Sequence, residues 1–232
     1  MQISGAVALV TGANRGLGKE FVTSLLDRGA AKVYAAARRP ELIDLPGVET
    51  LRLDITDPAS VAAAVAAAPD VTLLINNAGI STGHNLITGD LAEIRREMDT
   101  HYYGTLAVIR AFAPQLAGGA ILNVLSALSW FSYDGSNAYA AAKAAAWSLT
   151  NGVRLELAAQ HTLVTGLHLG AADTDMSASY DGPKVAPAEV VAAALDGLEE
   201  NRIEVLADDW SRHVKASVAN DPSDFYTLTP AA

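Results

Sequence analysis

Tyr139 and Lys143 lie four positions apart and have side chains that together can transfer a proton. The surrounding stretch, residues 137–147, is rich in alanine, which favours a helix. On a helix, positions i and i+4 share a face, so the phenol and the ammonium can reach the same point. Ser126 closes an apolar run earlier in the chain and supplies a hydroxyl. Alone, the pair is also typical of an amphipathic helix with a buried ring and a lysine that reaches solvent.

The spacing also predicts how the acidity of the phenol is controlled. A free phenol has a pKa of about 10, which is too high for easy proton exchange near neutral pH. A unit charge about 4 Å away, at an effective dielectric of about 20, is worth ~4 kcal/mol or about three pKa units. We therefore expect Lys143 to lower the pKa of Tyr139.

Seven short apolar runs are expected to form the strands that position these residues. They are residues 6–10, 32–37, 48–53, 71–75, 120–125, 163–169 and 203–206, with helical stretches between them. Runs that are apolar throughout indicate a parallel sheet covered on both faces. The predicted fold is a doubly wound α/β sheet in a single domain, residues 1–232. The tail, residues 220–232, could be mobile, or Phe225 and Tyr226 could pin it to the body or to a neighbouring subunit.

Local signals predict where several helices begin. Asp57 is a candidate N-cap before Pro58, and Pro187 is well suited to a first helical position. Asp90 is followed three positions later by Glu93, which resembles a capping box.

A glycine-rich loop follows the first predicted strand and leads directly into a helix. It contains Gly12, Asn14, Arg15, Gly16, Leu17 and Gly18. Glycines let the backbone approach a ligand closely, and the amides and dipole of a helix N-terminus favour a pyrophosphate. A tight turn between strand and helix could also use glycines, but the place after the first strand predicts a dinucleotide site.

The second predicted strand indicates which dinucleotide is bound. Sites for NAD usually place an acidic residue near the end of this strand, whereas the 2′-phosphate of NADP needs a cation. Here Ala37 occupies that position and Arg38 and Arg39 follow it, while Arg15 lies in the glycine loop. The pattern predicts NADP(H), although all three arginines could instead be merely solvated.

Together these motifs resemble the short-chain dehydrogenase/reductase family over nearly the whole chain. The matching segments are Thr11-Gly12-x-x-x-Gly16-x-Gly18, Asn76-Asn-Ala-Gly79, Ser126, Tyr139-x-x-x-Lys143 and Gly170-x-x-x-Thr174. The resemblance implies a Rossmann-type parallel sheet of about seven strands and a homo-oligomer, a dimer or a tetramer, formed through the helices that contain His101 and Tyr139. It also implies NADP(H) as the hydride carrier.

The resemblance further implies a role for individual residues. Tyr139 would act as acid and base, Lys143 would hold the nicotinamide ribose, and Ser126 would hydrogen-bond the carbonyl oxygen of the substrate. The remaining cofactor contacts would come from Asp54 and Ile55 at the adenine, from Asn76, Ala78 and Gly79 beside the central sheet, and from Gly170, Ala172 and Thr174 at the nicotinamide carboxamide. Asp54 could instead simply cap a turn.

Two positions depart from the family pattern. Leu169 replaces the usual proline before Gly170, which should loosen that turn slightly. His101 stands where the family has a catalytic asparagine that supports a water linking the lysine to solvent. The histidine could relay protons, since its unperturbed pKa is about 6.5, or it could be a packed side chain without a chemical role.

The expected function is reduction of an apolar or aromatic ketone or aldehyde, of the carbonyl reductase type. The predicted pocket consists of Ala127, Leu128, Ser129, Trp130, Phe131, Met176, Ser177 and Tyr180. One alternative is a dinucleotide-binding regulator without catalysis. Another is a serine hydrolase, because Ser81 lies in a G-x-S-x-G sequence, but that motif needs an immediate helix, and the next predicted helix begins near Asp90.

Composition excludes several classes of site and partner. The chain contains no cysteine, and its five histidines show no metal-ligand spacing, so we expect no metal. A net charge of −10 disfavours nucleic acid. No apolar run reaches the ~18 residues that span a bilayer, and no leader peptide is recognisable, so we expect no membrane partner and a cytoplasmic location.

Overall fold

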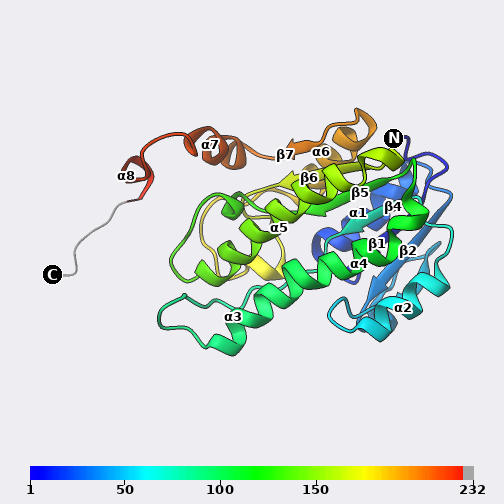
Figure 1. Ribbon diagram of the computed structural model, residues 1–232, viewed down its shortest axis with the longest axis horizontal. Coiled ribbons are helices and arrows are strands. Elements are labelled where there is room, and N and C mark those ends of the chain that lie inside the picture. Colours follow the sequence, from blue (N-terminus) through cyan, green and yellow to red (C-terminus); the bar gives the residue numbers. More distant parts are fainter. Residues whose placement is uncertain (227–232) are drawn as a thin grey trace.

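A computed structural model describes residues 1–226 and places one parallel sheet at the centre of the molecule (Figure 1). The strands are β1 (Val7–Thr11), β2 (Lys32–Ala37), β3 (Glu49–Arg52), β4 (Leu73–Asn76), β5 (Ala120–Val124), β6 (Leu163–His168) and β7 (Glu204–Leu206). Their order is β3-β2-β1-β4-β5-β6-β7, and every pairing is parallel. This arrangement confirms the predicted fold class, and each predicted run contains or overlaps one strand.

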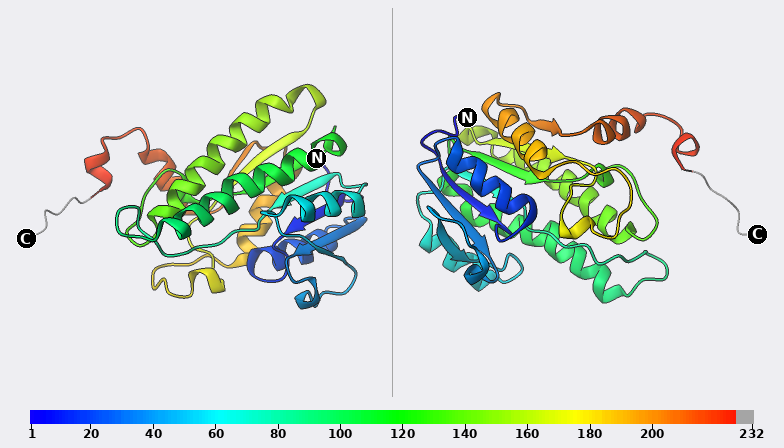
Figure 2. Two further views of the ribbon diagram at one scale, coloured as in Figure 1. Left: turned by 60° about the horizontal axis from the view of Figure 1, so that its bottom comes forward. Right: turned by 180° about the vertical axis from the view of Figure 1, so that it is seen from behind.

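Helices cover both faces of the sheet. They are α1 (Gly16–Asp27), α2 (Pro58–Ala67), α3 (Leu91–Met98), α4 (Thr105–Phe112), α5 (Asn137–Glu156), α6 (Pro187–Glu199), α7 (Asp209–Ser217) and α8 (Pro222–Phe225). Helices α1 and α6 face the viewer in the right panel of Figure 2, and their apolar side chains form one buried layer against the sheet. Those of α2, α4 and α5 form the layer on the other face. The two layers explain why the strands are apolar throughout.

The helix starts largely follow the predicted signals. Asp57 accepts a hydrogen bond from the amide of Ala59 at 2.9 Å, and Asp90 accepts one from the amide of Ala92 at 2.8 Å. The expected capping box is only half formed, because Glu93 pairs with Arg96 at 3.0 Å instead of reaching back to the cap.

Buried polar side chains tie the two central strands to the longest helix. The Asn76 amide donates to the Asn123 side chain at 2.8 Å, and Asn123 donates to the hydroxyl of Thr150 at 3.0 Å. Asn76 ends β4, Asn123 lies in β5 and Thr150 lies in α5. These bonds fix α5 relative to the carboxyl ends of the strands.

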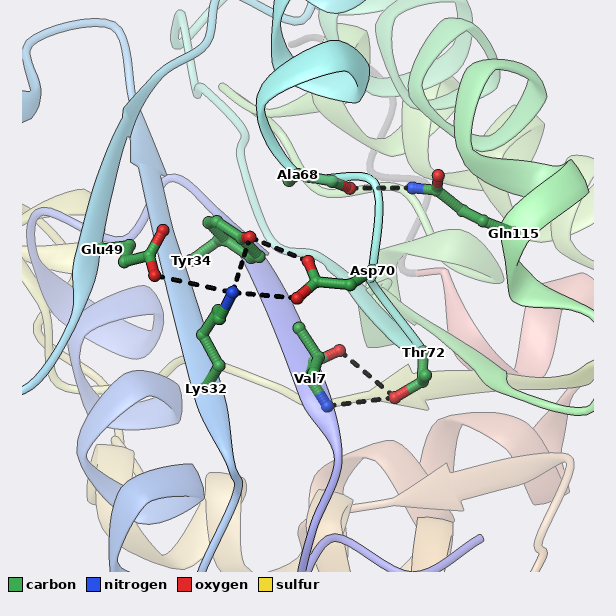
Figure 3. A network of polar contacts seen from close by, with 8 residues as sticks. All are labelled: Val7, Lys32, Tyr34, Glu49, Ala68, Asp70, Thr72 and Gln115. Carbon is green, nitrogen blue, oxygen red and sulfur yellow. Dashed lines mark hydrogen bonds and ion pairs between the residues drawn. The ribbon is translucent and has the colours of Figure 1, made fainter.

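A polar network links the beginnings of the strands, at the end of the sheet opposite to their carboxyl ends (Figure 3). Lys32 donates to Asp70 at 2.8 Å and to the Tyr34 hydroxyl at 3.1 Å, and Tyr34 donates to Asp70 at 2.8 Å. Thr72 bonds the amide and the carbonyl of Val7, which pins the starts of β4 and β1 together. The side chains where the strands begin therefore stabilise the fold, and the carboxyl ends of the strands are left to form a functional site.

Helices α7 and α8 extend away from the sheet at the end of the chain (Figure 1). Phe131 packs against Phe225 and Tyr226, with ring centroids 4.5 and 5.3 Å apart. The Tyr226 hydroxyl also accepts a hydrogen bond from the amide of Ser132 at 3.0 Å. The start of the tail is thus pinned to the body, while residues 227–232 lie outside the described part. Among residues 1–226, none of the helices is both long and apolar enough to cross a membrane.

Candidate active site

A large cleft lies along the carboxyl ends of the strands and has a volume of about 2320 Å³. Pockets for one small ligand usually have volumes of about 300–1,000 Å³, so this cleft has room for a dinucleotide and a substrate together. Most of the predicted site residues line it: Gly12, Asn14, Arg15, Gly16, Leu17, Arg38, Asp54, Ile55, Ala78, Gly79, His101, Ser126, Tyr139, Lys143, Gly170, Ala172 and Thr174.

The glycine loop forms one end of the cleft, and its shape depends on close backbone packing. Gly12 and Gly16 have φ angles of +67° and +54°, which favour glycine, and α1 begins at Gly16. A Cβ on Gly12 would lie 2.9 Å from the Cα of Ala78. Gly18 does not line the cleft, because it packs against the carbonyl of Gly12 inside the turn. The loop therefore presents its amides and the start of α1 to a phosphate group.

Asn77 also lies in this region, although it was not among the predicted cofactor contacts. Its amide nitrogen donates to the carbonyls of Thr11 and Gly12 at 2.9 and 3.2 Å, which ties the end of β4 to the glycine loop. Asn76, by contrast, is buried between β4 and β5 and does not line the cleft. Asn76 was expected, with Ala78 and Gly79, to stabilise the central sheet and to line the cofactor; its side chain bonds Asn123 in the sheet, and its contact with the cofactor stays a prediction.

The far end of the cleft is lined by cations and by one carboxylate. Arg38 and Arg39 follow the end of β2, where no acidic residue stands. Burial raises the pKa of the Asp54 carboxyl, but hydrogen bonds from Thr56 and the charge of Arg38 lower it overall. Asp54 both caps its turn, with 2.7 Å to the Thr56 hydroxyl, and lines the cleft. Arg15 pairs with Asp175 at 3.3 Å across exposed side chains, so it is only weakly restrained.

Ser126, Tyr139 and Lys143 meet at the centre of the cleft. Ser126 caps a short helical turn, and its oxygen accepts a hydrogen bond from the amide of Leu128 at 3.1 Å. Its hydroxyl proton is therefore free to be donated elsewhere. The Lys143 ammonium is buried and donates to the carbonyl of Val124 at 2.7 Å, while it lies 5.5 Å from the centre of the Tyr139 ring.

The pKa values of Tyr139 and Lys143 differ from those expected from their spacing. Burial raises the pKa of Tyr139 strongly, the charge of Glu97 raises it further, and a hydrogen bond from Ser126 lowers it. Burial lowers the pKa of Lys143 to about 8, although Glu97 opposes this change. The expected lowering of the pKa of Tyr139 by Lys143 is not found: burial dominates the pKa of the phenol, and the ammonium, which donates to the carbonyl of Val124, lies 5.5 Å from the ring centre.

His101 lies on a single π-helical turn, η2 (Asp99–Gly104), between α3 and α4. Its ring is buried and meets the Tyr139 ring edge-on, with centroids 5.2 Å apart. Nε2 lies 2.8 Å from the carbonyl oxygen of Ile80 and 3.2 Å from a carboxylate oxygen of Glu97. Burial and the charge of Lys143 lower the pKa of His101, whereas Glu97 raises it. Glu97, which is fully buried, has no part in the sequence motifs.

The turn after β6 is held by Asp208, the residue that caps α7. The amide of Gly170 donates to the carboxylate of Asp208 at 2.6 Å, and the carbonyl of Leu169 accepts from the amide of Ala127 at 2.8 Å. These bonds fix the turn despite Leu169, so the loosening expected from the missing proline finds no support. Thr174 caps the following turn in a capping box with Ser177.

The remaining part of the cleft has an apolar and partly aromatic wall, formed by Ala127, Leu128, Phe131, Tyr133, Met176, Ser177, Tyr180 and Trp210. Charged side chains, among them Asp181, Lys184 and Arg212, line it as well. Ser129 and Trp130 were expected here but do not line the cleft: Ser129 is buried, and the half-buried Trp130 stacks on His168 with centroids 3.8 Å apart. Ser81 lies in a loop without an adjoining helix, since α3 begins only at Leu91, so the geometry of a nucleophile elbow is missing.

Comparisons with known proteins agree with this geometry. A family model described as short chain dehydrogenase matches residues 6–184. The crystal structure of a short chain dehydrogenase from Burkholderia cenocepacia J2315 in complex with NADP is 41% identical, covers 99% of this chain and 100% of that chain, and has a TM-score of 0.95. A Burkholderia phymatum relative in complex with NAD, 22% identical with a TM-score of 0.83, covers 100% of this chain and 99% of its own and shares the fold.

Among characterised enzymes, the 3-oxoacyl-(acyl-carrier-protein) reductase of Escherichia coli (strain K12) is similar over its full length. It is 29% identical over an alignment of 245 residues, which covers 98% of this chain and 100% of that enzyme. The match of the family model, the order of the sheet and the residues at its carboxyl edge lead to one conclusion. This chain belongs to the short-chain dehydrogenase/reductase family of oxidoreductases.

Proposed function

We propose that the protein is an NADP(H)-dependent oxidoreductase that reduces an apolar or aromatic ketone or aldehyde to the alcohol. The observation that carries this proposal is the meeting of Ser126, Tyr139 and Lys143 in the cleft that the glycine loop also lines. NADP is the ligand of the similar Burkholderia cenocepacia structure, although another relative binds NAD.

The cleft fits a dinucleotide phosphate through residues at three places. The glycine loop can take the pyrophosphate, because it lines the cleft and leads into the N-terminus of α1 at Gly16. Arg38 and Arg39, with Ala37 in place of an acidic residue, favour a 2′-phosphate over a free ribose hydroxyl. The turn from Gly170 to Thr174 can hold the nicotinamide amide. When bound, NADPH supplies the hydride.

The residues of the chain supply the proton and the position of the substrate. The Ser126 hydroxyl donates a hydrogen bond to the carbonyl oxygen, and Tyr139 donates its proton to that oxygen as negative charge develops. Lys143 remains close enough to favour the phenolate that results. With a pKa of about 8, Lys143 can itself lose and regain a proton near neutral pH. His101 is proposed as the next group through which that proton is replaced from solvent.

The residues at the substrate end of the cleft favour an apolar substrate. Phe131, Tyr180 and Trp210 line it together with Met176, and aromatic and thioether groups adapt well to apolar ligands.

We further propose that the protein assembles as a homo-oligomer through α4 and α5, which lie side by side on one face (Figures 1 and 2).

The function is tested with a panel of aliphatic and aromatic aldehydes, ketones and alcohols, assayed with NADPH, NADH and their oxidised forms. We expect turnover of apolar carbonyls that is faster with NADPH. Tyr139→Phe should lose roughly 10²- to 10⁴-fold in kcat and still bind NADPH by fluorescence. Tyr34→Phe is the control, because that hydroxyl lies at the opposite edge of the sheet. Binding of NADPH without turnover of any carbonyl would instead indicate a regulator.

A further inference from the structure

Glu97 is a fully buried carboxylate inside the catalytic centre. It lies on α3, one helical turn before His101. One of its oxygens accepts a hydrogen bond from the amide of Thr82 at 2.6 Å. The other lies 3.2 Å from Nε2 of His101 and has no hydrogen-bond partner within the described chain. A carboxylate is costly to bury unless its oxygens meet donors or charges, so its place beside His101 needs an explanation.

The contacts of His101 determine which ring nitrogen carries the proton. Nε2 lies 2.8 Å from the carbonyl oxygen of Ile80, and a carbonyl oxygen can only accept. The amide of Ile80 also lies 3.4 Å from Nε2 and can only donate, but the two shorter contacts, to the Ile80 carbonyl and to Glu97 at 3.2 Å, are both to acceptors, so we place the proton on Nε2. In the neutral ring, Nδ1 is then the nitrogen with the free electron pair.

Several elements supply the charged and polar groups that surround Glu97 and His101. Tyr139 and Lys143 face it from α5, the loop after β4 adds Ile80 and Thr82, and η2 carries His101 itself. Lys143 opposes a positive charge on the imidazole, whereas Glu97 and the hydrogen bond to the carbonyl of Ile80 favour one. The two buried charges, Lys143 and Glu97, thus balance each other around His101.

We propose that Glu97 is a positioning residue, which holds the Nε2 proton of His101 so that Nδ1 exchanges protons with the Lys143 and Tyr139 side of the site. This inference rests on the proposed reductase function. During reduction, Tyr139 gives its proton to the new alcohol oxygen, Lys143 returns one to Tyr139, and the imidazolium of His101 returns one to Lys143. Solvent water then protonates His101 again, so one proton is taken from solvent for each alcohol formed.

Nuclear magnetic resonance of ¹⁵N-labelled histidine tests the pair without any turnover. We expect the Nε2–H form for His101 in the wild type. In Glu97→Gln, we expect His101 to take up its second proton at lower pH, because the charge that favours the imidazolium is gone. The Nδ1–H form in the wild type, or an unchanged titration in the variant, would overturn the proposal.

Kinetics of the same variants test whether the pair acts in catalysis. Glu97→Gln should lower kcat roughly ten- to hundred-fold, because the variant removes the negative charge that lies 3.2 Å from Nε2 of His101. Glu93→Gln is the matched control, since Glu93 lies one turn earlier on α3, pairs with Arg96 and lies outside the cleft. It should retain wild-type kcat.

His101→Asn separates an effect through the histidine from a general loss of structure. This change restores the residue type that the family has at this position. In that background, Glu97→Gln should change kcat less than about two-fold, because residues that act as a unit are not additive. Independent, multiplying losses would refute the route through His101. If the wild type itself turned over no carbonyl, the proposed function would fail, and the resonance experiment would still decide the state of the pair.

Discussion

At the scale of single residues, burial governs the acid and base groups of this protein more than neighbouring charges do. Tyr139, Lys143 and His101 are all shifted toward their neutral forms by removal from water. Glu97 partly reverses this effect on Lys143 and His101, and it strengthens it on Tyr139. The site therefore keeps its proton donor protonated until a substrate and a cofactor change the balance.

The proposed preference for NADPH depends on single cations that follow the end of β2. Arg38→Ala should raise KM for NADPH roughly ten- to hundred-fold, since a charge-assisted hydrogen bond contributes about 1.5–3 kcal/mol. KM for NADH should change little, because that cofactor has no 2′-phosphate. Arg110→Ala, on the exposed side of α4, is the control. Comparable catalytic efficiency of the wild type with both cofactors would contradict the assignment.

His168 gives a prediction for stability at low pH. It lies at the end of β6 and donates from Nδ1 to the carbonyl of Ser126 at 3.0 Å. Burial lowers its pKa to about 4, and Glu204, 3.9 Å from Nε2, is itself paired with Lys215.

The native state thus binds this proton less readily than the unfolded chain, whose histidines titrate near 6.5. Stability is retained above that pH and should fall by about 3 kcal/mol as the pH drops from 6.5 through 4. Urea unfolding of the wild type and of His168→Gln, at pH 7 and at pH 4, measures the difference. Equal acid losses in the two proteins would show that His168 does not titrate in this way.

At the scale of elements, the ends of helices and strands place the site. The π-helical turn η2 between α3 and α4 brings His101 under Tyr139, and Gly104 at its end allows Ile55 to approach closely. Such turns are frequent at functional sites because they re-aim one side chain without ending the helix. The cleft is therefore built where regular structure is interrupted.

The capping of α7 by Asp208 should couple stability to cofactor binding. Its carboxylate accepts from the amides of Ser211 and Gly170, each at 2.6 Å. Asp208→Ala should cost about 1–2 kcal/mol of unfolding free energy and raise KM for NADPH, because the turn at Gly170 loses its partner. Chemical denaturation and kinetics measure the two effects. The neighbouring exposed Asp209→Ala should change neither, and a Gly170 turn that binds NADPH normally in Asp208→Ala would refute the coupling.

At the scale of the whole molecule, two apolar layers bury the sheet and leave the outer surfaces of α4 and α5 for assembly. Leu155, on α5, has 79% of its surface exposed. Leu155→Asp should therefore convert an oligomer to smaller species in light scattering, since a charge disfavours an apolar contact. Ile87→Asp, on the exposed loop before α3, is the control and should not. A monomeric wild type would contradict the proposed assembly.

The order of strands and helices, the glycine loop and the spacing of Tyr139 and Lys143 could be predicted from the sequence, because each depends on short-range periodicity or on the freedom of glycine. The class of fold followed from strands that are apolar throughout. Only the tertiary structure decided that Asn76 and Gly18 pack inside the protein, that Asp208 holds the turn at Gly170, and that Glu97 joins the catalytic centre. These contacts join residues far apart in the chain, and their energies depend on burial, which local spacing does not encode.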